Sequence, residues 1–359
     1  MNTALAAIFE GTTRQLVLRE LPVPQPRRGE ILVRVLGCTL CGSDLHSFAG
    51  RRSVPVPTVL GHEIVGEIAA LGEAAPASDL VGEPLRIGDR ITWAIVASCG
   101  DCYYCCRGLE QKCERAVKYG HEPFGRGREL TGGLAEFCLL APGTGIVRLP
   151  AELPLATACP ASCATGTVTA ALQAAGDLQD RVVIVLGAGM LGVTACALAS
   201  VAGAKDIIAV DQQADRRTRA LRFGATRVAP LDELPDAVKA ASDNHGADVI
   251  IELTGSPAVF ETALPLARLG GSIVLVGSVF PQAPIPLALE QIVRRNLNLH
   301  GVHNYRPQHL VASVRFLTAT RDRFPWSSLV EKWYPLREAA TAFDTAAGGT
   351  SIRIGVRPE

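Results

Sequence analysis

Four cysteines in the first third of the chain have the spacing of a metal site. They are Cys99, Cys102, Cys105 and Cys113. Two-residue gaps allow successive thiolates to converge on one ion, and the longer last gap allows the chain to loop back and complete a tetrahedron. Because four sulfur ligands fill all coordination positions of the ion, the pattern predicts a structural zinc ion in a lobe formed by about residues 95–115. The alternative is a set of unligated or disulfide-bonded cysteines, and Cys106 is an adjacent spare thiol.

A glycine-rich turn in the second half has the spacing of a dinucleotide-binding site. The segment Gly187-Ala-Gly-Met-Leu-Gly192 follows an apolar run and precedes a helical pattern. Gly187 permits the tight turn, Gly189 lets a pyrophosphate approach the backbone, and Gly192 lets helix and strand pack closely. The helix start, with Met190 and Leu191 in its first turn, offers free N–H groups to the phosphates. The alternative is a glycine turn that binds nothing.

An acidic residue, Asp211, ends the next expected strand. A carboxylate at this position accepts hydrogen bonds from the adenosine ribose and repels a 2′-phosphate, which favours NAD over NADP. Arg216 and Arg217 leave NADP as the alternative cofactor, because a nearby arginine can accommodate the 2′-phosphate. Arg216 is therefore also a candidate cofactor contact.

Three further segments carry residues that could bind a metal or move a proton. They are Cys41-Gly-Ser-Asp-Leu-His46, Gly61-His-Glu-Ile-Val-Gly66 and Cys159-Pro-Ala-Ser-Cys163. Taken alone, each has a structural explanation, because a buried cysteine is usually a small apolar filler and a histidine is often only hydrogen-bonded. Their meaning depends on whether the fold brings them together.

The length and composition limit what the protein can be. A chain of 359 residues with 48% hydrophobic and 19% charged residues suits two globular domains. The 35 basic and 35 acidic residues cancel, so no basic excess indicates nucleic acid or an anionic membrane as a partner. The N-terminus lacks the basic start and apolar block of a signal peptide. Together with eleven cysteines, this favours a reducing compartment and therefore a cytoplasmic protein.

The hydrophobic pattern changes near residue 165. Short apolar runs between Gly/Pro turns make residues 1 to about 160 look β-rich. Strand-like and helix-like segments then alternate, which predicts a doubly wound parallel sheet and an α/β protein. The expected strands are 182–186, 206–210, 249–253 and 273–276, and the expected helices are 190–201, 214–223 and 258–267. Residues 182–204 lack charge and are long enough to span a bilayer, but glycines divide them into strand, turn and helix.

Together these motifs resemble the zinc-dependent medium-chain alcohol dehydrogenases over essentially the whole chain. The matching segments also include Gly88-Asp-Arg-Ile91, Gly132-Gly-Leu-Ala-Glu-Phe137 and Ser351-Ile-Arg353. The resemblance implies a GroES-like catalytic domain, residues 1–164 and 304–359, split around a Rossmann domain, residues 165–303. In that family the two domains flank an active-site cleft.

The resemblance also implies a second, catalytic zinc ion, and thus two per chain. Cys41 and His62 would be two of its ligands, and the third would be Cys163, with Cys159 as the competitor. The Cys₂His set is that of alcohol dehydrogenases themselves. Glu63 would lie beside the metal and could enter its coordination shell.

Further roles follow from the same resemblance. Ser43 would take the proton of the alcohol and pass it through the nicotinamide ribose toward His46. Asp44 would orient His62 through its outer nitrogen. Arg353 would contact the cofactor pyrophosphate. The alternatives are that Ser43 only caps a turn and that His46 is simply exposed.

The substrate is less well defined by the sequence. The expected pocket walls include Leu40, His46, Phe48 and Tyr119. Residues 118–122 and 300–306 add polar and cationic groups near the expected cleft. They predict a polar, and in one interpretation anionic, hydroxylated small molecule as substrate. The alternative is that these basic residues are surface or cofactor contacts.

Finer details leave several functions open. Ser162-Cys-Ala-Thr-Gly-Thr167 and Gly301-Val-His-Asn-Tyr305 resemble a bacterial branch associated with phosphonate catabolism. Alternatives are a polyol or threonine-type amino-acid dehydrogenase of the same family and, from another class, a non-catalytic cofactor-binding protein. The family resemblance also implies a homo-oligomer, either a dimer or a tetramer.

Overall fold

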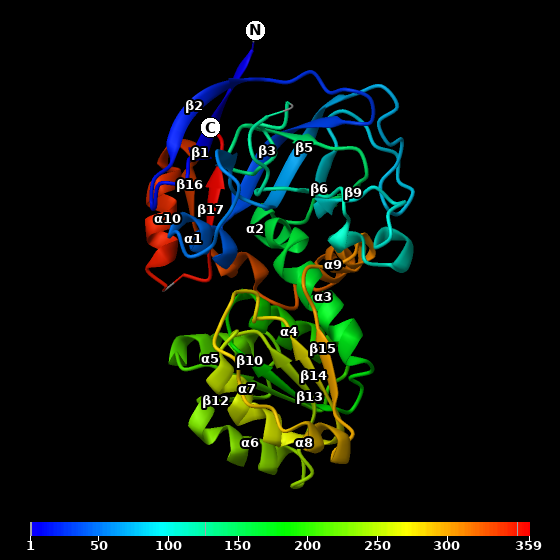
Figure 1. Ribbon diagram of the computed structural model, residues 1–359, viewed down its shortest axis with the longest axis vertical. Coiled ribbons are helices and arrows are strands. Elements are labelled where there is room, and N and C mark those ends of the chain that lie inside the picture. Colours follow the sequence, from blue (N-terminus) through cyan, green and yellow to red (C-terminus); the bar gives the residue numbers. More distant parts are fainter. Residues whose placement is uncertain (1, 126, 350) are drawn as a thin grey trace. The chain divides into compact units, whose positions relative to one another are not determined.

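A computed structural model of the chain describes residues 2–125, 127–349 and 351–359. The chain divides into two compact units (Figure 1). Unit 1 consists of Met1–Cys163 and Arg306–Glu359, and unit 2 consists of Ala164–Tyr305. The chain therefore enters unit 2 directly after Cys163 and returns to unit 1 at Arg306.

Unit 1 is built mainly from β-strands. Its larger sheet has the order β16-β17-β3-β5-β6-β7, with β8 paired to β3 and β9 paired to β6, and its smaller sheet has the order β2-β1-β4. The strands of the larger sheet are β3 (Ile31–Thr39), β5 (Glu63–Leu71), β6 (Arg90–Ala97), β7 (Val117–Lys118), β8 (Phe137–Leu140), β9 (Thr144–Arg148), β16 (Val330–Pro335) and β17 (Arg353–Arg357). The strands of the smaller sheet are β1 (Thr3–Phe9), β2 (Val17–Pro22) and β4 (Thr58–Val59).

Short helices connect and cover these sheets. The α-helices of unit 1 are α1 (Gly42–Phe48), α2 (Leu155–Ala158), α9 (Pro307–Ala319) and α10 (Ala339–Ala347). Its 3₁₀ turns are η1 (Cys105–Arg107), η2 (Glu110–Lys112), η3 (Cys159–Ser162), η6 (Trp326–Leu329) and η7 (Leu336–Glu338). The last strand, β17, pairs with β3, so the C-terminal tail completes the sheet that begins near the N-terminus.

The pairing of β3 with β5 positions the loops that follow and precede them. The two strands are antiparallel, and Thr39 at the end of β3 lies opposite Glu63 at the start of β5. Side chains such as Val33, Ile64 and Ile68 are fully or almost fully buried between the strands and their neighbours. Because burial of this face fixes the register, the ends of the two strands are held next to each other.

Unit 2 is a six-stranded parallel sheet with helices on both faces. Its strand order is β12-β11-β10-β13-β14-β15. If β10 is counted as the first strand, this is the order 3-2-1-4-5-6 of a doubly wound dinucleotide-binding fold. The strands are β10 (Val182–Leu186), β11 (Asp206–Val210), β12 (Arg227–Ala229), β13 (Ala247–Glu252), β14 (Ala267–Leu275) and β15 (Asn298–Gly301).

Alternate side chains of these strands enter two separate cores. Val183 and Val185 pack with α3 (Ala164–Ala175) and α4 (Met190–Val201) on one face. Ile184 and Leu186 pack with α6 (Leu234–Ala241) and α7 (Pro257–Ala263) on the other. The remaining elements are α5 (Ala214–Arg222), α8 (Leu289–Arg294), η4 (Leu231–Glu233) and η5 (Leu264–Leu266). A central strand buried on both faces explains the continuous apolar run in the sequence.

The structure confirms the predicted fold class and corrects two boundaries, the end of one helix and the start of the next strand. The helix expected over residues 258–267 is α7, which ends at Ala263. Pro265 lies in the following 3₁₀ turn, where it removes a backbone donor and stops the α-helix. The next strand, β14, then begins at Ala267, six residues before the expected 273.

The apolar run 182–204 is divided between strand β10 and helix α4. Over the described residues, no single helix has the length and hydrophobicity needed to cross a membrane. One bent pair, Leu155–Ser162 with Ala164–Ala175, meets the criteria of length and composition only when its two parts are joined.

Candidate active site

Three candidate metal ligands lie together in unit 1. The Sγ atoms of Cys41 and Cys163 are 3.8 Å apart, and one ligand atom from each of Cys41, Cys163 and His62 lies within 4.8 Å of the others. Zinc–sulfur bonds of about 2.3 Å in a tetrahedron place two sulfurs about 3.8 Å apart. The donor types and their spacing therefore fit a zinc ion held by three protein ligands, which leaves one coordination position for another group.

The carboxylate of Asp44 joins the segments that carry two of these ligands. Asp44 is 1% exposed and lies in the first turn of α1. Its Oδ2 accepts a hydrogen bond from the Cys41 backbone N–H at 2.9 Å, and its Oδ1 accepts one from the Gly61 N–H at 3.2 Å. Oδ1 also lies 3.2 Å from Nδ1 of His62. One side chain thus holds the start of α1 against the loop between β4 and β5.

The same contact selects the nitrogen of His62 that can bind a metal. Because Nδ1 donates to Asp44, Nε2 is the nitrogen that remains available as a ligand. The hydroxyl of Ser43 lies 3.4 Å from Nε2, so it is directly beside the candidate metal position. The contact with Cys163 lowers the pKa of the Cys41 thiol well below its usual value, which favours the thiolate that binds metal.

The two cysteines near the end of the first segment of unit 1 occupy different environments. Cys163 contributes to the donor cluster, whereas the Cys159 thiol is fully buried and donates a weak hydrogen bond to the carbonyl of Gly37 at 3.4 Å. The pKa is raised for both thiols, by burial for Cys159 and by the contact with Cys41 and burial for Cys163, so position rather than pKa separates them. The geometry therefore supports Cys163 over Cys159 as the third ligand.

Glu63 and Arg353 form a buried ion pair next to the donor cluster. Arg353 donates from Nε to Oε2 of Glu63 at 2.9 Å and from Nη2 to Oε1 at 3.0 Å, and Thr39 donates a further hydrogen bond to Oε2 at 2.6 Å. Nη2 of Arg353 also lies 3.7 Å from Sγ of Cys41. The carboxylate that could enter the metal shell is thus held by Arg353, the residue that was expected to contact the pyrophosphate.

His46 lies three residues after Ser43 in α1 and therefore on the same side of the helix. Partial burial, followed by the nearby charge of Arg51, lowers the pKa of His46 below its usual value. The imidazole therefore favours its neutral form, which can accept a proton.

Three of the expected pocket walls are wrong. Leu40 and Phe48 belong to a hydrophobic core that includes Phe343, and Tyr119 is fully buried in a second core. The Tyr119 hydroxyl also contacts Oγ1 of Thr144 at 2.5 Å. Apolar and aromatic residues near a predicted cleft look the same in sequence whether they face the substrate or the core.

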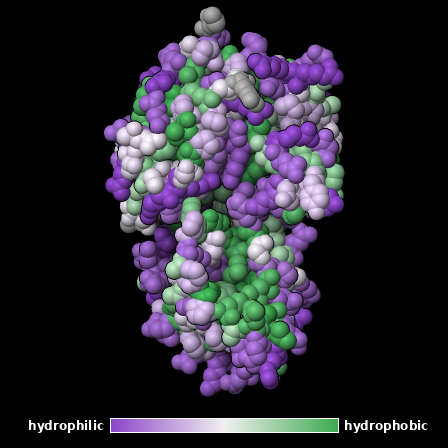
Figure 2. All heavy atoms as spheres, viewed as in Figure 1, coloured by the Kyte–Doolittle hydropathy of each residue, from purple (hydrophilic) through white to green (hydrophobic). Residues whose placement is uncertain are grey.

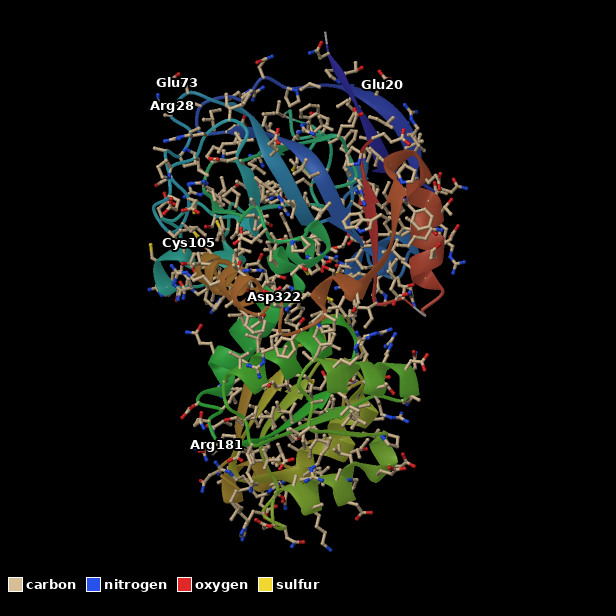
Figure 3. The ribbon with its side chains drawn as sticks, turned by 180° about the vertical axis from the view of Figure 1, so that it is seen from behind. Glu20, Arg28, Glu73, Cys105, Arg181 and Asp322 are labelled. Atoms are coloured by element: carbon tan, nitrogen blue, oxygen red, sulfur yellow. The ribbon has the colours of Figure 1, made fainter. Side chains whose placement is uncertain are left out.

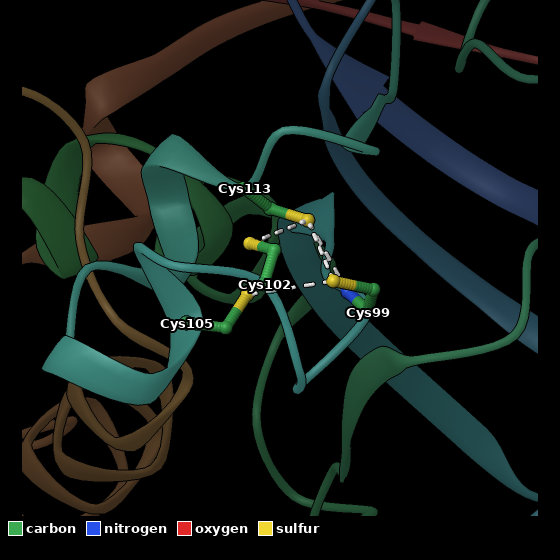
Figure 4. Close-up of side chains that lie close together, drawn as sticks. All are labelled: Cys99, Cys102, Cys105 and Cys113. Atoms are coloured by element: carbon green, nitrogen blue, oxygen red, sulfur yellow. Dashed lines mark hydrogen bonds between the residues drawn. The ribbon is translucent and has the colours of Figure 1, made fainter.

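The four remaining candidate ligands form a separate cluster in unit 1 (Figure 4). Sγ of Cys99 lies 3.4 Å from Sγ of Cys113 and 3.9 Å from Sγ of Cys105, and Sγ of Cys102 lies 4.0 Å from Sγ of Cys113. These distances are close to the edge of a zinc tetrahedron and far above a disulfide bond of about 2.05 Å. The cluster therefore fits a structural zinc ion. Cys106 is exposed and lies outside it.

The cysteine lobe is anchored to the rest of unit 1 by an ion pair. Glu110 of η2 accepts from Nε of Arg306 at 2.8 Å and from Nη2 at 3.1 Å, just before α9 begins. Figures 1 and 3 both show the lobe, marked by Cys105 in Figure 3, beside α9 at the margin of unit 1. A zinc ion in the lobe would thus stiffen a peripheral segment.

The glycine turn in unit 2 has the geometry that its spacing predicts. Gly187 has a φ of +95°, which favours glycine, and a Cβ atom on Gly192 would lie only 1.8 Å from the Gly187 carbonyl oxygen. By contrast, a Cβ on Gly189 would meet no atom within 4 Å. Gly189 thus leaves room for a ligand, and Gly187 and Gly192 shape the turn. Met190 is buried and Leu191 is half-buried at the start of α4.

Asp211 lines a cavity of about 270 Å³, together with Gly187, Arg216 and Thr254. Its Oδ2 accepts a hydrogen bond from the Ala188 N–H at 2.9 Å, so the carboxylate is positioned next to the glycine turn. Nη1 of Arg216 lies 3.8 Å from the same oxygen. Arg217 instead donates to the backbone carbonyls of Asp211 and Gln212.

The structural zinc cluster gives a direct prediction. The variant C105S should lose about one zinc ion per chain and unfold at a lower temperature, because a structural metal contributes directly to folding free energy. The neighbouring variant C106S should retain the zinc content and melting temperature of the wild type. Zinc analysis by mass spectrometry together with thermal unfolding tests both variants, and equal zinc loss in the two would contradict the assignment.

The second donor cluster gives a matched prediction. The variant C163S should lose the second zinc ion, whereas C159A should retain it because its thiol faces the Gly37 carbonyl. Zinc content measured by mass spectrometry separates the two cysteines. Loss of zinc in C159A and retention in C163S would reverse the assignment.

Comparisons with known proteins agree with these sites and this fold. Residues 27–151 match a family model described as the alcohol dehydrogenase GroES-like domain, and residues 191–319 match one described as zinc-binding dehydrogenase. The chain is 29% identical to the 5-exo-hydroxycamphor dehydrogenase of Pseudomonas putida, over 98% of both chains. It is 28% identical to the L-threonine 3-dehydrogenase of Coxiella burnetii, over 94% of this chain and 95% of that one.

A solved structure extends the agreement to the whole fold. The alcohol dehydrogenase of Thermotoga maritima matches all of this chain and all of its own length with a TM-score of 0.94 and 28% identity. Unit 1 corresponds in type to the GroES-like catalytic domain and unit 2 to the Rossmann-type domain. The chain belongs to the zinc-dependent medium-chain alcohol dehydrogenase family and is a zinc- and nicotinamide-dependent oxidoreductase.

Proposed function

We propose that the enzyme transfers a hydride between the hydroxyl-bearing carbon of a small polar substrate and NAD. The observation that carries the proposal is the cluster of Cys41, His62 and Cys163, with the Ser43 hydroxyl beside the available nitrogen of His62. When bound, zinc acts as a Lewis acid on the substrate oxygen and the nicotinamide ring accepts the hydride.

The proton of the alcohol needs an acceptor on the protein. In this proposal Ser43 takes it and passes it toward His46, which follows on the same side of α1. Asp44 holds Cys41 and His62 in position through its three contacts, so that the ligands need little rearrangement during turnover. The Arg353–Glu63 pair stabilises the buried carboxylate close to Cys41, and we keep a pyrophosphate contact as a second role for Arg353.

NAD is the proposed cofactor form. Its support is the carboxylate of Asp211, fixed beside the glycine turn, where it would meet the ribose hydroxyls and repel a 2′-phosphate. Gly187, Gly189 and Gly192, with Met190 and Leu191 at the start of α4, would surround the pyrophosphate. Arg216 lies beside Asp211 and would face the adenosine ribose.

Two substrate types remain within this proposal. One is an amino acid or polyol, which the similarity to proteins named L-threonine 3-dehydrogenase supports. The other is a hydroxylated phosphonate, which rests on the resemblance of residues 162–167 and 301–305 to the phosphonate-associated branch. Both are small polar molecules that carry a hydroxyl group.

We also propose a cytoplasmic homo-oligomer, either a dimer or a tetramer, with no nucleic acid or membrane partner. Figure 2 shows hydrophobic surface on unit 2 in the region of β14, β15 and α8. Leu289 and Val293 of α8 are 71% and 73% exposed, and β15 is an edge strand of its sheet. Such a surface is typical of a protein–protein contact. The balanced charge supports the proposal that nucleic acid and membrane are not partners. The free cysteines support a cytoplasmic location.

The proton acceptor role gives a prediction for Ser43. The variant S43A should lower kcat at least about 100-fold, because loss of a positioned proton acceptor has effects of that order. S43T, which keeps a hydroxyl, should recover most of the rate. Both variants should retain two zinc ions per chain. A kcat within threefold of the wild type for S43A would rule out the proposed role.

The cofactor preference gives a prediction for Asp211. The variant D211N should raise the KM for NAD by about 10- to 100-fold, since hydrogen bonds to a charged group contribute about 1.5–3 kcal/mol. The KM for NADP should fall. The charge-matched control is D215N, which removes the charge of an exposed carboxylate in α5. It should leave the KM values for NAD and NADP unchanged. A wild-type enzyme that already prefers NADP would contradict the proposal.

A further inference from the structure

Two cations beside the metal ligands of unit 1 lack an acidic partner. They are Arg52, which follows α1, and Lys118, at the end of β7. Among residues 2–125, 127–349 and 351–359, no carboxylate lies within 4.0 Å of either side-chain charge. By contrast, Arg353 is paired with Glu63 and Arg306 with Glu110.

One imidazole links Arg52 to the metal site. Nη1 of Arg52 donates to Nε2 of His121 at 2.6 Å, and Nδ1 of His121 donates to the Tyr119 carbonyl at 2.9 Å. The His121 ring also lies against the ring of the metal ligand His62, with the two ring centroids 5.3 Å apart. His121 is therefore held as a neutral spacer that fixes the guanidinium of Arg52 one ring away from His62.

Lys118 faces the same region. The charges of Cys41 and Cys163 act on both Lys118 and Arg52, and Arg52 acts on Lys118. Burial, followed by the repulsion from Arg52, lowers the pKa of Lys118 to about 8. Burial also lowers the pKa of Arg52. Both charged groups are thus held in a partly desolvated position, where a cation without a counter-charge is unfavourable.

The nearby acidic groups are already occupied. Asp44 accepts from two backbone N–H groups and from His62. Oε1 of Glu122 accepts from the backbone N–H of Lys118, and its Oε2 lies 3.8 Å from Arg128. A zinc ion with two thiolate ligands and a neutral imidazole would add no net negative charge to the region. A bound anion would supply the counter-charge that Arg52 and Lys118 do not receive from a direct ion pair.

We propose that Arg52 and Lys118 form an anion-binding subsite next to the catalytic ligands, and that the substrate carries a carboxylate or phosphonate a short distance from its hydroxyl-bearing carbon. This inference rests on the proposed function. The planar guanidinium of Arg52 would offer its remaining N–H groups to two oxygens of the anion, and Lys118 would add a point charge. His121 is a positioning residue, because it acts on the anion only through Arg52.

Matched substrates test the subsite. The three test substrates are 3-hydroxybutyrate, 2-hydroxypropylphosphonate and the neutral 3-hydroxybutanamide. Each is assayed with NAD and the zinc-loaded enzyme. For R52Q and K118Q, kcat/KM on the preferred anionic substrate should fall at least about tenfold, as expected for loss of a charge-assisted contact. The neutral amide should change less than threefold. The preferred substrate identifies the carboxylate or the phosphonate as the anion.

Exposed residues of the same type provide controls. R86Q alters an exposed arginine of unit 1, and K239Q alters an exposed lysine in α6. Both should leave all three kcat/KM values unchanged. Equal losses on neutral and anionic substrates in R52Q would overturn the proposal. So would a weaker Kd for NAD in R52Q without a change for the substrates, because the cations would then serve the cofactor.

Direct binding separates failure of the subsite from failure of the proposed function. Calorimetric titration of the enzyme–NADH complex with butyrate or propylphosphonate should show binding that is at least about tenfold weaker in R52Q. Butanamide should not distinguish the two proteins. Anion binding that depends on Arg52 without turnover of any alcohol would support the subsite and reject the proposed function. Turnover of neutral alcohols with no Arg52-dependent anion binding would reject the subsite alone.

Discussion

The arrangement of the catalytic ligands depends on one buried carboxylate. Asp44 accepts hydrogen bonds from the Cys41 N–H, the Gly61 N–H and Nδ1 of His62. These three donors come from two loops that follow β3 and precede β5, and the register of those strands brings the loops together. A carboxylate this deeply buried is stable only because its acceptor capacity is used, so the ligand geometry and the local fold stabilise each other.

The two units supply different requirements of the chemistry. Unit 1 holds both donor clusters and the residues that would move a proton or bind an anion. Unit 2 provides a parallel sheet whose glycine turn and Asp211 lie after the carboxyl ends of β10 and β11, where nucleotides bind in folds of this type. The separate cysteine lobe has a closed set of four sulfurs and therefore contributes stability rather than reactivity.

The sequence predicted most of the fold because its signals are local. The glycine spacing, the acid after the next strand and the apolar runs identified the unit 2 sheet, and the cysteine spacing identified four residues that the structure places together. Pro265 was a local signal that explains the early end of α7. By contrast, the burial of Tyr119 and the pairing of Glu63 with Arg353 depend on contacts between distant segments, which spacing does not encode. No motif marks Arg52, and only its contact with His121 reveals it.

The central claim is that Cys41, His62 and Cys163 hold one metal ion. Diffraction from crystals of the zinc-loaded protein, measured on both sides of the zinc absorption edge, tests it most directly. The account predicts two anomalous peaks per chain, one among the four cysteines of the lobe and one bonded to Cys41 Sγ, His62 Nε2 and Cys163 Sγ. A single peak, in the lobe alone, would contradict it.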